Sequence, residues 1–186
     1  MEPIIERIIR VTEAMETFWR VAHGWAPADA AKLLAAARLD RQVSFANTLS
    51  DYVKPFPAQE GEARLILGYV TLRSLCEGIL KLFFSVWWED YRVDAAALKH
   101  KDGKVKPPGD IGFDRLIALY SAKGNAEYEL FLRRIQQRGN AIHHFTDAEI
   151  GTQQELIEDI AQFLDFLLAV NGGLPYPDEA YDPAHA

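Results

Sequence analysis

Three observations predict an all-α helical bundle for this chain of 186 residues. Apolar residues recur at intervals of three and four through most of the sequence, which is the spacing of one helix face. Glycine and proline gather in short stretches that separate these periodic segments. No segment alternates apolar and polar residues as a half-buried strand does. We therefore expect an up-and-down bundle of about five main helices and one short helix, built around a central hydrophobic helix.

The first two helices are expected before the proline pair at residues 55 and 57. From Ile4 to Trp19, apolar residues recur at helical spacing, and His23-Gly24 ends the run. Pro27 suits the first turn of a second helix, and Ala- and Leu-rich sequence continues it from Ala28 to Tyr52. Lys54-Pro-Phe-Pro57 must end this helix, because proline cannot continue the hydrogen-bond ladder.

The third expected helix, Glu62 to Tyr91, is apolar over most of its circumference. A helix of this kind is normally surrounded by other helices, so we expect it at the centre of the bundle. A loop from Ala95 to Gly112 follows, and then a short helix from Phe113 to Ser121.

The last two helices lie on either side of a turn near residue 148. The first runs from Ala126 to Phe145 and the second from Thr152 to Val170, where Thr152 and Glu155 have the spacing of a capping box. Residues 1–174 are expected to form one domain, and residues 175–186 a proline-rich, extended C-terminal tail.

Composition excludes several classes of protein. The net charge of −7 argues against non-specific binding to nucleic acid or anionic membranes, although it permits a local basic site. Cys76 is the single cysteine, which excludes an internal disulfide or a cysteine-based zinc site. Neither a secretory signal nor an apolar run of about 18 residues is found. A cytoplasmic protein that needs no cofactor is expected.

The candidate functional residues lie in one segment, Arg138-Gly-Asn-Ala-Ile-His143-His144-Phe145. A guanidinium group can hold phosphate oxygens, and an imidazole can move protons near neutral pH. On a regular helix, Arg138 and His143 would border a core stripe formed by Tyr128, Phe131, Leu132, Ile135, Gly139 and Ile142. The opposite face would carry Arg133, Gln137, Asn140 and His144. The two histidines would point about 100° apart, so they cannot chelate one metal ion.

An arginine followed by histidine after four to six residues, late in a helical domain, resembles the HEPN superfamily (higher eukaryotes and prokaryotes nucleotide-binding domain). The stretch from Arg73 to Lys81 and the Leu-Pro-Tyr-Pro segment also look like bacterial members. The resemblance implies a two-fold homodimer in which two motifs meet and cleave RNA without metal. Arg138 would then hold the phosphate, His143 or His144 would act as acid and base, and Asn140 would orient substrate or imidazole.

The sequence departs from the common family motif, in which a polar residue, often asparagine, follows the arginine. Gly139 occupies that position here, and Asn140 comes one residue later. Two structural roles for the arginine therefore stay open, a phosphate contact and an ion pair with a neighbouring acid. Arg73, Glu77 and Lys81 either form an ion-pair ladder along their helix or orient a motif residue.

Three functions remain open. The first is a metal-independent endoribonuclease of toxin or defence type, with an antitoxin or another protein as partner. The second is a non-catalytic HEPN-like module that binds a nucleotide, RNA or a protein, and the third is a structural domain. For the first two functions, the candidate RNA contacts are Arg133, Gln137, Lys99, Lys101, Lys104 and Lys106.

Overall fold

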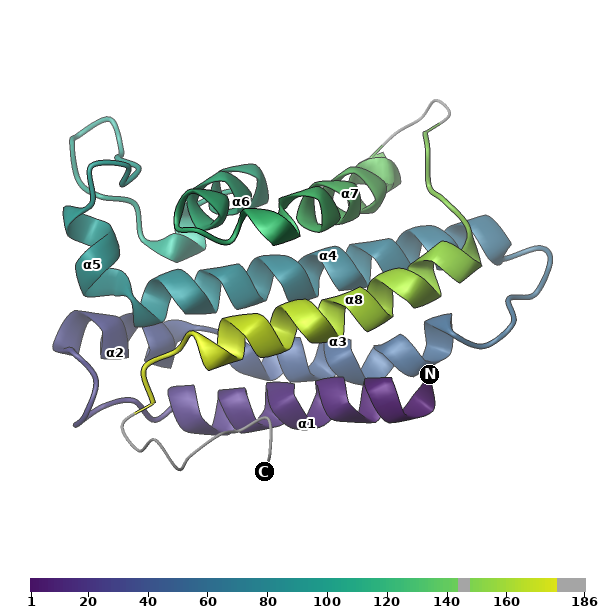
Figure 1. Ribbon diagram of the computed structural model, residues 1–186, viewed down its shortest axis with the longest axis horizontal. Coiled ribbons are helices and arrows are strands. Elements are labelled where there is room, and N and C mark those ends of the chain that lie inside the picture. Colours follow the sequence, from purple (N-terminus) through teal and green to yellow (C-terminus); the bar gives the residue numbers. More distant parts are fainter. Residues whose placement is uncertain (144–147, 177–186) are drawn as a thin grey trace.

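The computed structural model describes residues 1–143 and 148–176, and this part of the chain is helical (Figure 1). One isolated β-bridge, between Lys99 and Val105, interrupts the helical pattern. The α-helices of the described part are α1 (Glu2–Trp19), α2 (Ala28–Ala36), α3 (Leu39–Tyr52), α4 (Gly61–Val86), α5 (Trp88–Val93), α6 (Phe113–Ala122), α7 (Glu129–Gly139) and α8 (Gln153–Gly172). Short 3-10 helices are η1 (Pro108–Asp110), η2 (Ala126–Tyr128) and η3 (Asn140–His143). The prediction of an all-α bundle is confirmed.

Two of the expected helices are each broken into two. The helix expected from residue 28 to 52 breaks at Ala37, whose ψ of 140° is extended, and Arg38 then precedes α3. The helix expected from residue 62 to 91 breaks at Trp87, whose ψ of 29° separates α4 from α5. Neither break contains glycine or proline, so the sequence carries no local signal for it.

The motif helix is shorter than expected. It starts as the 3-10 helix η2, becomes α-helical over α7, and continues after Gly139 as the 3-10 helix η3. A 3-10 helix has about three residues per turn, so an α-helical wheel fails beyond this point. Ile142, expected in the core, is 47% exposed. His143, expected to border the core, is also exposed.

The core lies along α4. This helix packs against α2, α3, α6, α7 and α8, and its side chains Tyr69, Leu72, Leu75 and Leu80 are fully buried. In Figure 1, α6 and α7 lie on one side of α4, whereas α1 lies farther away beyond α3 and α8. Among the helices of the described residues, none is long and apolar enough to cross a lipid bilayer.

The C-terminal helix begins as the sequence predicts. The Thr152 hydroxyl accepts a hydrogen bond from the backbone N–H of Glu155, and the Glu155 carboxylate accepts one from the Thr152 backbone. Beyond α8, Leu174 is buried, and the Tyr176 ring packs against Trp19. The first residues after α8 therefore belong to the packed domain, although Tyr176 was expected in an extended tail.

Candidate functional site

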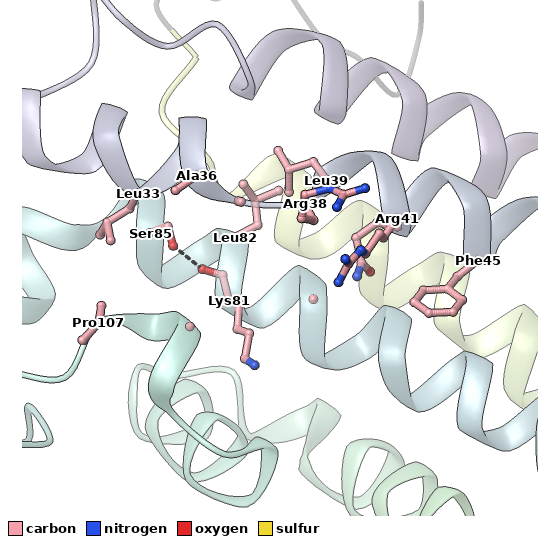
Figure 2. A pocket seen from close by; sticks show the side chains of 14 residues that line it. Leu33, Ala36, Arg38, Leu39, Arg41, Phe45, Lys81, Leu82, Ser85 and Pro107 are labelled. Atoms are coloured by element: carbon pink, nitrogen blue, oxygen red, sulfur yellow. Dashed lines mark hydrogen bonds between the residues drawn. The ribbon is translucent and has the colours of Figure 1, made fainter.

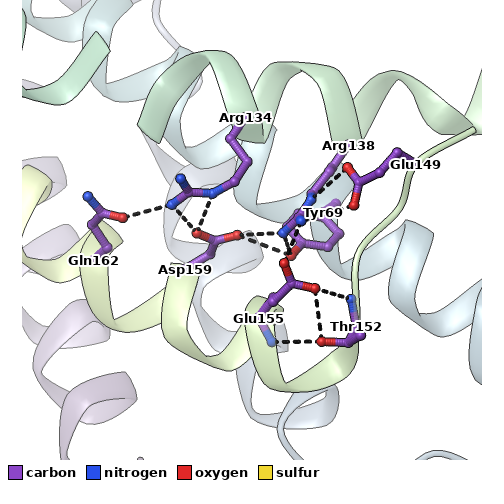
Figure 3. A network of polar contacts seen from close by, with 8 residues as sticks. All are labelled: Tyr69, Arg134, Arg138, Glu149, Thr152, Glu155, Asp159 and Gln162. Atoms are coloured by element: carbon purple, nitrogen blue, oxygen red, sulfur yellow. Dashed lines mark hydrogen bonds and ion pairs between the residues drawn. The ribbon is translucent and has the colours of Figure 1, made fainter. Parts of the chain in front are cut away.

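Arg138 lies at the centre of a buried ion cluster and is only 5% exposed (Figure 3). Its Nη1 donates to the Tyr69 hydroxyl at 2.7 Å and to Asp159 Oδ2 at 3.4 Å. Its Nη2 donates to Glu149 Oε1 at 3.0 Å and to Glu155 Oε1 at 2.7 Å. Its Nε donates to Glu149 Oε2 at 3.2 Å. A guanidinium carries five N–H groups, so these five contacts use all of its donors.

The cluster connects four parts of the chain. Asp159 on α8, itself 3% exposed, also accepts from Arg134 Nη2 at 2.6 Å and from the Tyr69 hydroxyl at 3.1 Å. Glu155, at the start of α8, contacts both Arg138 and the capping residue Thr152. The network therefore holds α7, α4, the start of α8 and the segment before it together.

Electrostatics keeps the side chains of Arg138 and Glu155 ionised. Burial alone would lower the pKa of Arg138, but its hydrogen bonds with Glu149 and Glu155 outweigh burial and raise that pKa. The hydrogen bond from Arg138, followed by the one from Thr152, lowers the pKa of Glu155. Burial, reinforced by the charge of Asp159, raises the pKa of Tyr69, which therefore stays a neutral phenol. The cluster is thus a set of satisfied ion pairs, and the pKa shifts of Arg138, Glu155 and Tyr69 all lead away from proton exchange near neutral pH.

Acid is expected to weaken this cluster. Because the pKa of Glu155 in the folded protein lies below its ordinary value of 4.5, its ion pair contributes stability that is present above that value and lost as the pH falls through the folded pKa. Glu155→Gln cannot titrate, yet it keeps a side chain suited to the capping box. Urea unfolding between about pH 5 and pH 3 should show a shallower loss of stability in this variant than in the wild type. Glu158→Gln, one turn along α8, is the control, and equal slopes for wild type and Glu155→Gln would contradict the assignment.

Gly139 lies where α7 crosses α4. A Cβ at this position would lie 2.7 Å from Arg73 Cδ, 2.8 Å from Arg73 Cβ and 3.1 Å from the Tyr69 carbonyl oxygen. The absence of a side chain at residue 139 therefore allows α7 to approach α4 closely. Arg73 itself stacks over the Phe113 ring, at 5.7 Å from its centroid.

The ion-pair ladder on α4 also forms. Glu77 lies 2.8 Å from Lys81 Nζ and 3.5 Å from Arg73 Nη2. Of the two roles considered for these residues, the structure shows the ladder along the helix. Arg73 also contacts the motif helix, although through its aliphatic carbons at Gly139.

The other motif residues are not gathered around Arg138. Arg133 pairs with Asp114 at 2.6 Å on the surface, Gln137 is exposed and Asn140 is half-buried. The exposed His143 is absent from the contacts of Arg138 described above. His144 and Phe145 lie outside the described residues, so the pairing of Asn140 with His144 stays a prediction.

The predicted basic loop folds as a tight turn. The backbone N–H of His100 donates to the Lys104 carbonyl, and that of Lys106 donates to the Leu98 carbonyl. Lys99, Lys101 and Lys104 are exposed, and Lys104 pairs with Asp102. Lys106 leads directly into η1 through Pro107, which lines a cavity that the sequence did not reveal.

This cavity, which we call the α3–α4 cavity, has a volume of about 440 Å³. Figure 2 shows Arg41 and Phe45 on α3 and Lys81 on α4 around it. Its cations are Arg38, Arg41 and Lys81, and none of the described residues that line it is acidic. Its apolar wall comprises Leu33, Ala36, Ala37, Leu39, Phe45, Leu82 and Pro107.

Two polar groups of the α3–α4 cavity lack partners within the described chain. Arg38 pairs with Asp40 at 2.6 Å and Lys81 with Glu77 at 2.8 Å, but Arg41 forms no ion pair there. The Gln42 Oε1 atom is buried without a hydrogen-bond partner. Its carboxamide lies against Gly78, where an added Cβ would be 2.2 Å from Gln42 Cδ.

Comparison with known proteins found no match among protein-family models, curated proteins or solved structures. Function is therefore inferred from the chemistry of the chain itself. The sequence could not have revealed the α3–α4 cavity, because its lining residues come from three separate segments, residues 33–45, 78–85 and 107–109, which meet only in the folded chain.

Proposed function

We propose that this chain is a non-catalytic HEPN-like module with its bundle organised around α4. The module binds a nucleotide or a similar phosphate-bearing ligand in the α3–α4 cavity. The observation that carries the proposal is the cationic lining of this cavity. It presents Arg41, which forms no ion pair within the described chain, beside Arg38 and Lys81, which are paired with Asp40 and Glu77. None of the described lining residues is acidic, although the whole protein has a net charge of −7.

The state of Arg138 favours binding over RNA cleavage. To hold a scissile phosphate, this side chain would have to leave Glu149, Glu155 and Asp159. Vacating a buried ion cluster leaves unpaired charge behind, which is costly. A phosphate brought to the same place would also approach three carboxylates. The geometry thus supports the binding module better than the endoribonuclease.

The α3–α4 cavity offers three kinds of contact to such a ligand. Its volume of about 440 Å³ falls in the range of small-molecule sites, roughly 300–1,000 Å³. Arg41 can bind phosphate with two parallel N–H groups, because no carboxylate in the described chain occupies them. Gln42 Oε1 is buried and lacks a donor, and an N–H or O–H of the ligand would supply one if the carboxamide turns toward the cavity. Apolar side chains such as Phe45 and Leu82 can cover the rest of the ligand.

Arg41→Ala is expected to weaken nucleotide binding by about tenfold to a hundredfold. That is the size of one hydrogen-bonded contact to a charged group. Isothermal titration with ADP, with adenosine as the uncharged comparison, measures the effect. Arg133→Ala removes the same charge from the surface of α7 and should leave the affinity unchanged.

Gly78→Ala should displace the Gln42 carboxamide into the cavity and weaken binding without any change of charge.

Two results would contradict the proposal. One is the absence of saturable ADP binding by the wild type, and the other is equal binding of ADP and adenosine. Cleavage of a generic RNA by the wild type in the presence of chelator, lost in a stably folded Arg138→Ala variant, would instead establish the endoribonuclease. The homodimer and the antitoxin remain predictions from the resemblance.

A further inference from the structure

A second cavity, of about 300 Å³, lies on the opposite side of α4. We call it the aromatic cavity, and its lining residues are Phe83, Phe84, Trp87, Asp90, Tyr91, Lys123 and Asn125. At about 100° per residue, the α4 residues that line this cavity point roughly opposite to those that line the α3–α4 cavity. The two cavities therefore have separate linings and can be tested independently.

Helix ends of both polarities meet at the aromatic cavity. Trp87 is the C-terminal cap of α4 and the N-terminal cap of α5, and Lys123 is the C-terminal cap of α6. The Trp87 indole N–H donates, at 3.2 Å, to the carbonyl of Gly173, which caps the C-terminus of α8. The C-terminal end of a helix carries partial negative charge from its unpaired carbonyls. The N-terminal end of a helix, such as that of α5 here, carries partial positive charge. The helix ends therefore do not decide the charge of a ligand, which depends on the side chains.

The side-chain charges at the aromatic cavity favour a cationic ligand. Asp90 is exposed, and its carboxylate forms no ion pair or hydrogen bond with the described residues. Lys123 is the one cation among the described residues of the lining. Its ammonium group is paired with Asp94, which neutralises it. Because Lys123 is paired with Asp94, it does not compensate the charge of Asp90. The carboxylate of Asp90 is therefore available to a ligand.

Aromatic rings form most of the remaining wall. Phe83 and Phe84 meet edge to face with centroids 5.3 Å apart, and Tyr91 packs against Phe84 at 5.5 Å. The faces of such rings attract cations, and tryptophan attracts them most strongly. Aromatic rings and one free carboxylate together match an ammonium group that carries alkyl substituents.

We propose that the aromatic cavity binds a small organic cation, an alkylated or quaternary amine, with its charged nitrogen near Asp90 and its carbon atoms against Phe83 and Trp87. The volume of about 300 Å³ accommodates a compact amine and excludes a large ligand. This site is independent of the nucleotide site proposed above, because it shares none of its lining residues.

Choline chloride is the probe, and 3,3-dimethylbutan-1-ol, which has the same shape without the charge, is the comparison. Isothermal titration and tryptophan fluorescence should show saturable binding of choline by the full chain and much weaker binding of the neutral alcohol. Asp90→Asn should weaken choline binding about fivefold, as expected for a charge contact at a partly exposed site. Glu89→Gln is the matched control, since Glu89 is engaged with Arg92 at 2.8 Å, and its affinity should equal that of the wild type.

Three results would overturn this proposal. Equal affinity for choline and the neutral alcohol would show an apolar cavity without selectivity for charge. Choline binding that Asp90→Asn leaves unchanged would place the cation elsewhere. Absence of saturable choline binding by the folded wild type would exclude the site for this class of ligand. Arg41→Ala should not change choline affinity, so failure at one cavity is distinguishable from failure at the other.

Discussion

Arg138→Ala is expected to lower the free energy of unfolding by about 3 kcal/mol. The substitution removes the cation from a cluster in which the side chains of Arg138 and Asp159 are only 6% and 4% exposed. It also leaves the Tyr69 hydroxyl without its donor. The loss should not be larger, because Asp159 keeps Arg134 as its partner and Glu149 and Glu155 can reach solvent. Arg138 therefore acts chiefly in holding the start of α8 against α7.

Urea unfolding followed by circular dichroism measures this effect. Arg133→Ala is the control on the same helix, because Arg133 pairs with Asp114 on the surface and such a pair contributes about 0–1 kcal/mol. Arg138→Lys keeps the charge but loses the fork of donors, so its stability should lie between those of the wild type and Arg138→Ala. If Arg138→Ala unfolds within about 1 kcal/mol of the wild type, the cluster is not structural and a role in ligand binding regains its basis.

The helices could be predicted because their evidence is local. The Thr152 and Glu155 spacing is a signal within four residues, and the structure contains the capping box that it predicts. The breaks at Ala37 and Trp87 have no such signal, since neither place contains glycine or proline. They follow instead from packing, as the Leu39 side chain turns into the core and Trp87 reaches Gly173. Tertiary contacts of this kind override helix propensity and cannot be found in a sequence window.

The candidate site, like the helices, could be predicted only where the evidence is local in the sequence. The sequence placed Arg138 at the edge of a core stripe and allowed it an acidic partner, which is what the structure contains. It could not identify Glu149, Glu155 and Asp159 as the partners, because they come from a segment 11 to 21 residues later. The position of His143 was wrong for a different reason. The chain changes from an α-helix to a 3-10 helix at Asn140, so the residue positions of a regular α-helix no longer apply.

Gly139→Ala is expected to lower the free energy of unfolding by about 1–3 kcal/mol, the usual cost of forcing extra volume into packed structure. In a free helix the same change would be favourable by roughly 0.5–1 kcal/mol, because alanine loses less backbone entropy. Here the new methyl group would lie 2.8 Å from Arg73 Cβ and 3.1 Å from the Tyr69 carbonyl oxygen. Neither atom is the free end of a flexible side chain, so α7 must move away from α4.

The sign of the change separates a packing role from simple helix propensity. Gly61→Ala is the matched control, because Gly61 is also a terminal residue of its helix and an added Cβ would meet nothing within 4 Å. This variant should be as stable as the wild type or slightly more stable, whereas Gly139→Ala should be less stable in the same urea titration.

Since Tyr69 contributes both to the crossing and to the ion cluster, displacement of α7 should also disturb the contacts of Arg138. The losses from Gly139→Ala and Arg138→Ala should therefore not be additive in the double variant. Strict additivity would show that the helix crossing and the ion cluster are independent.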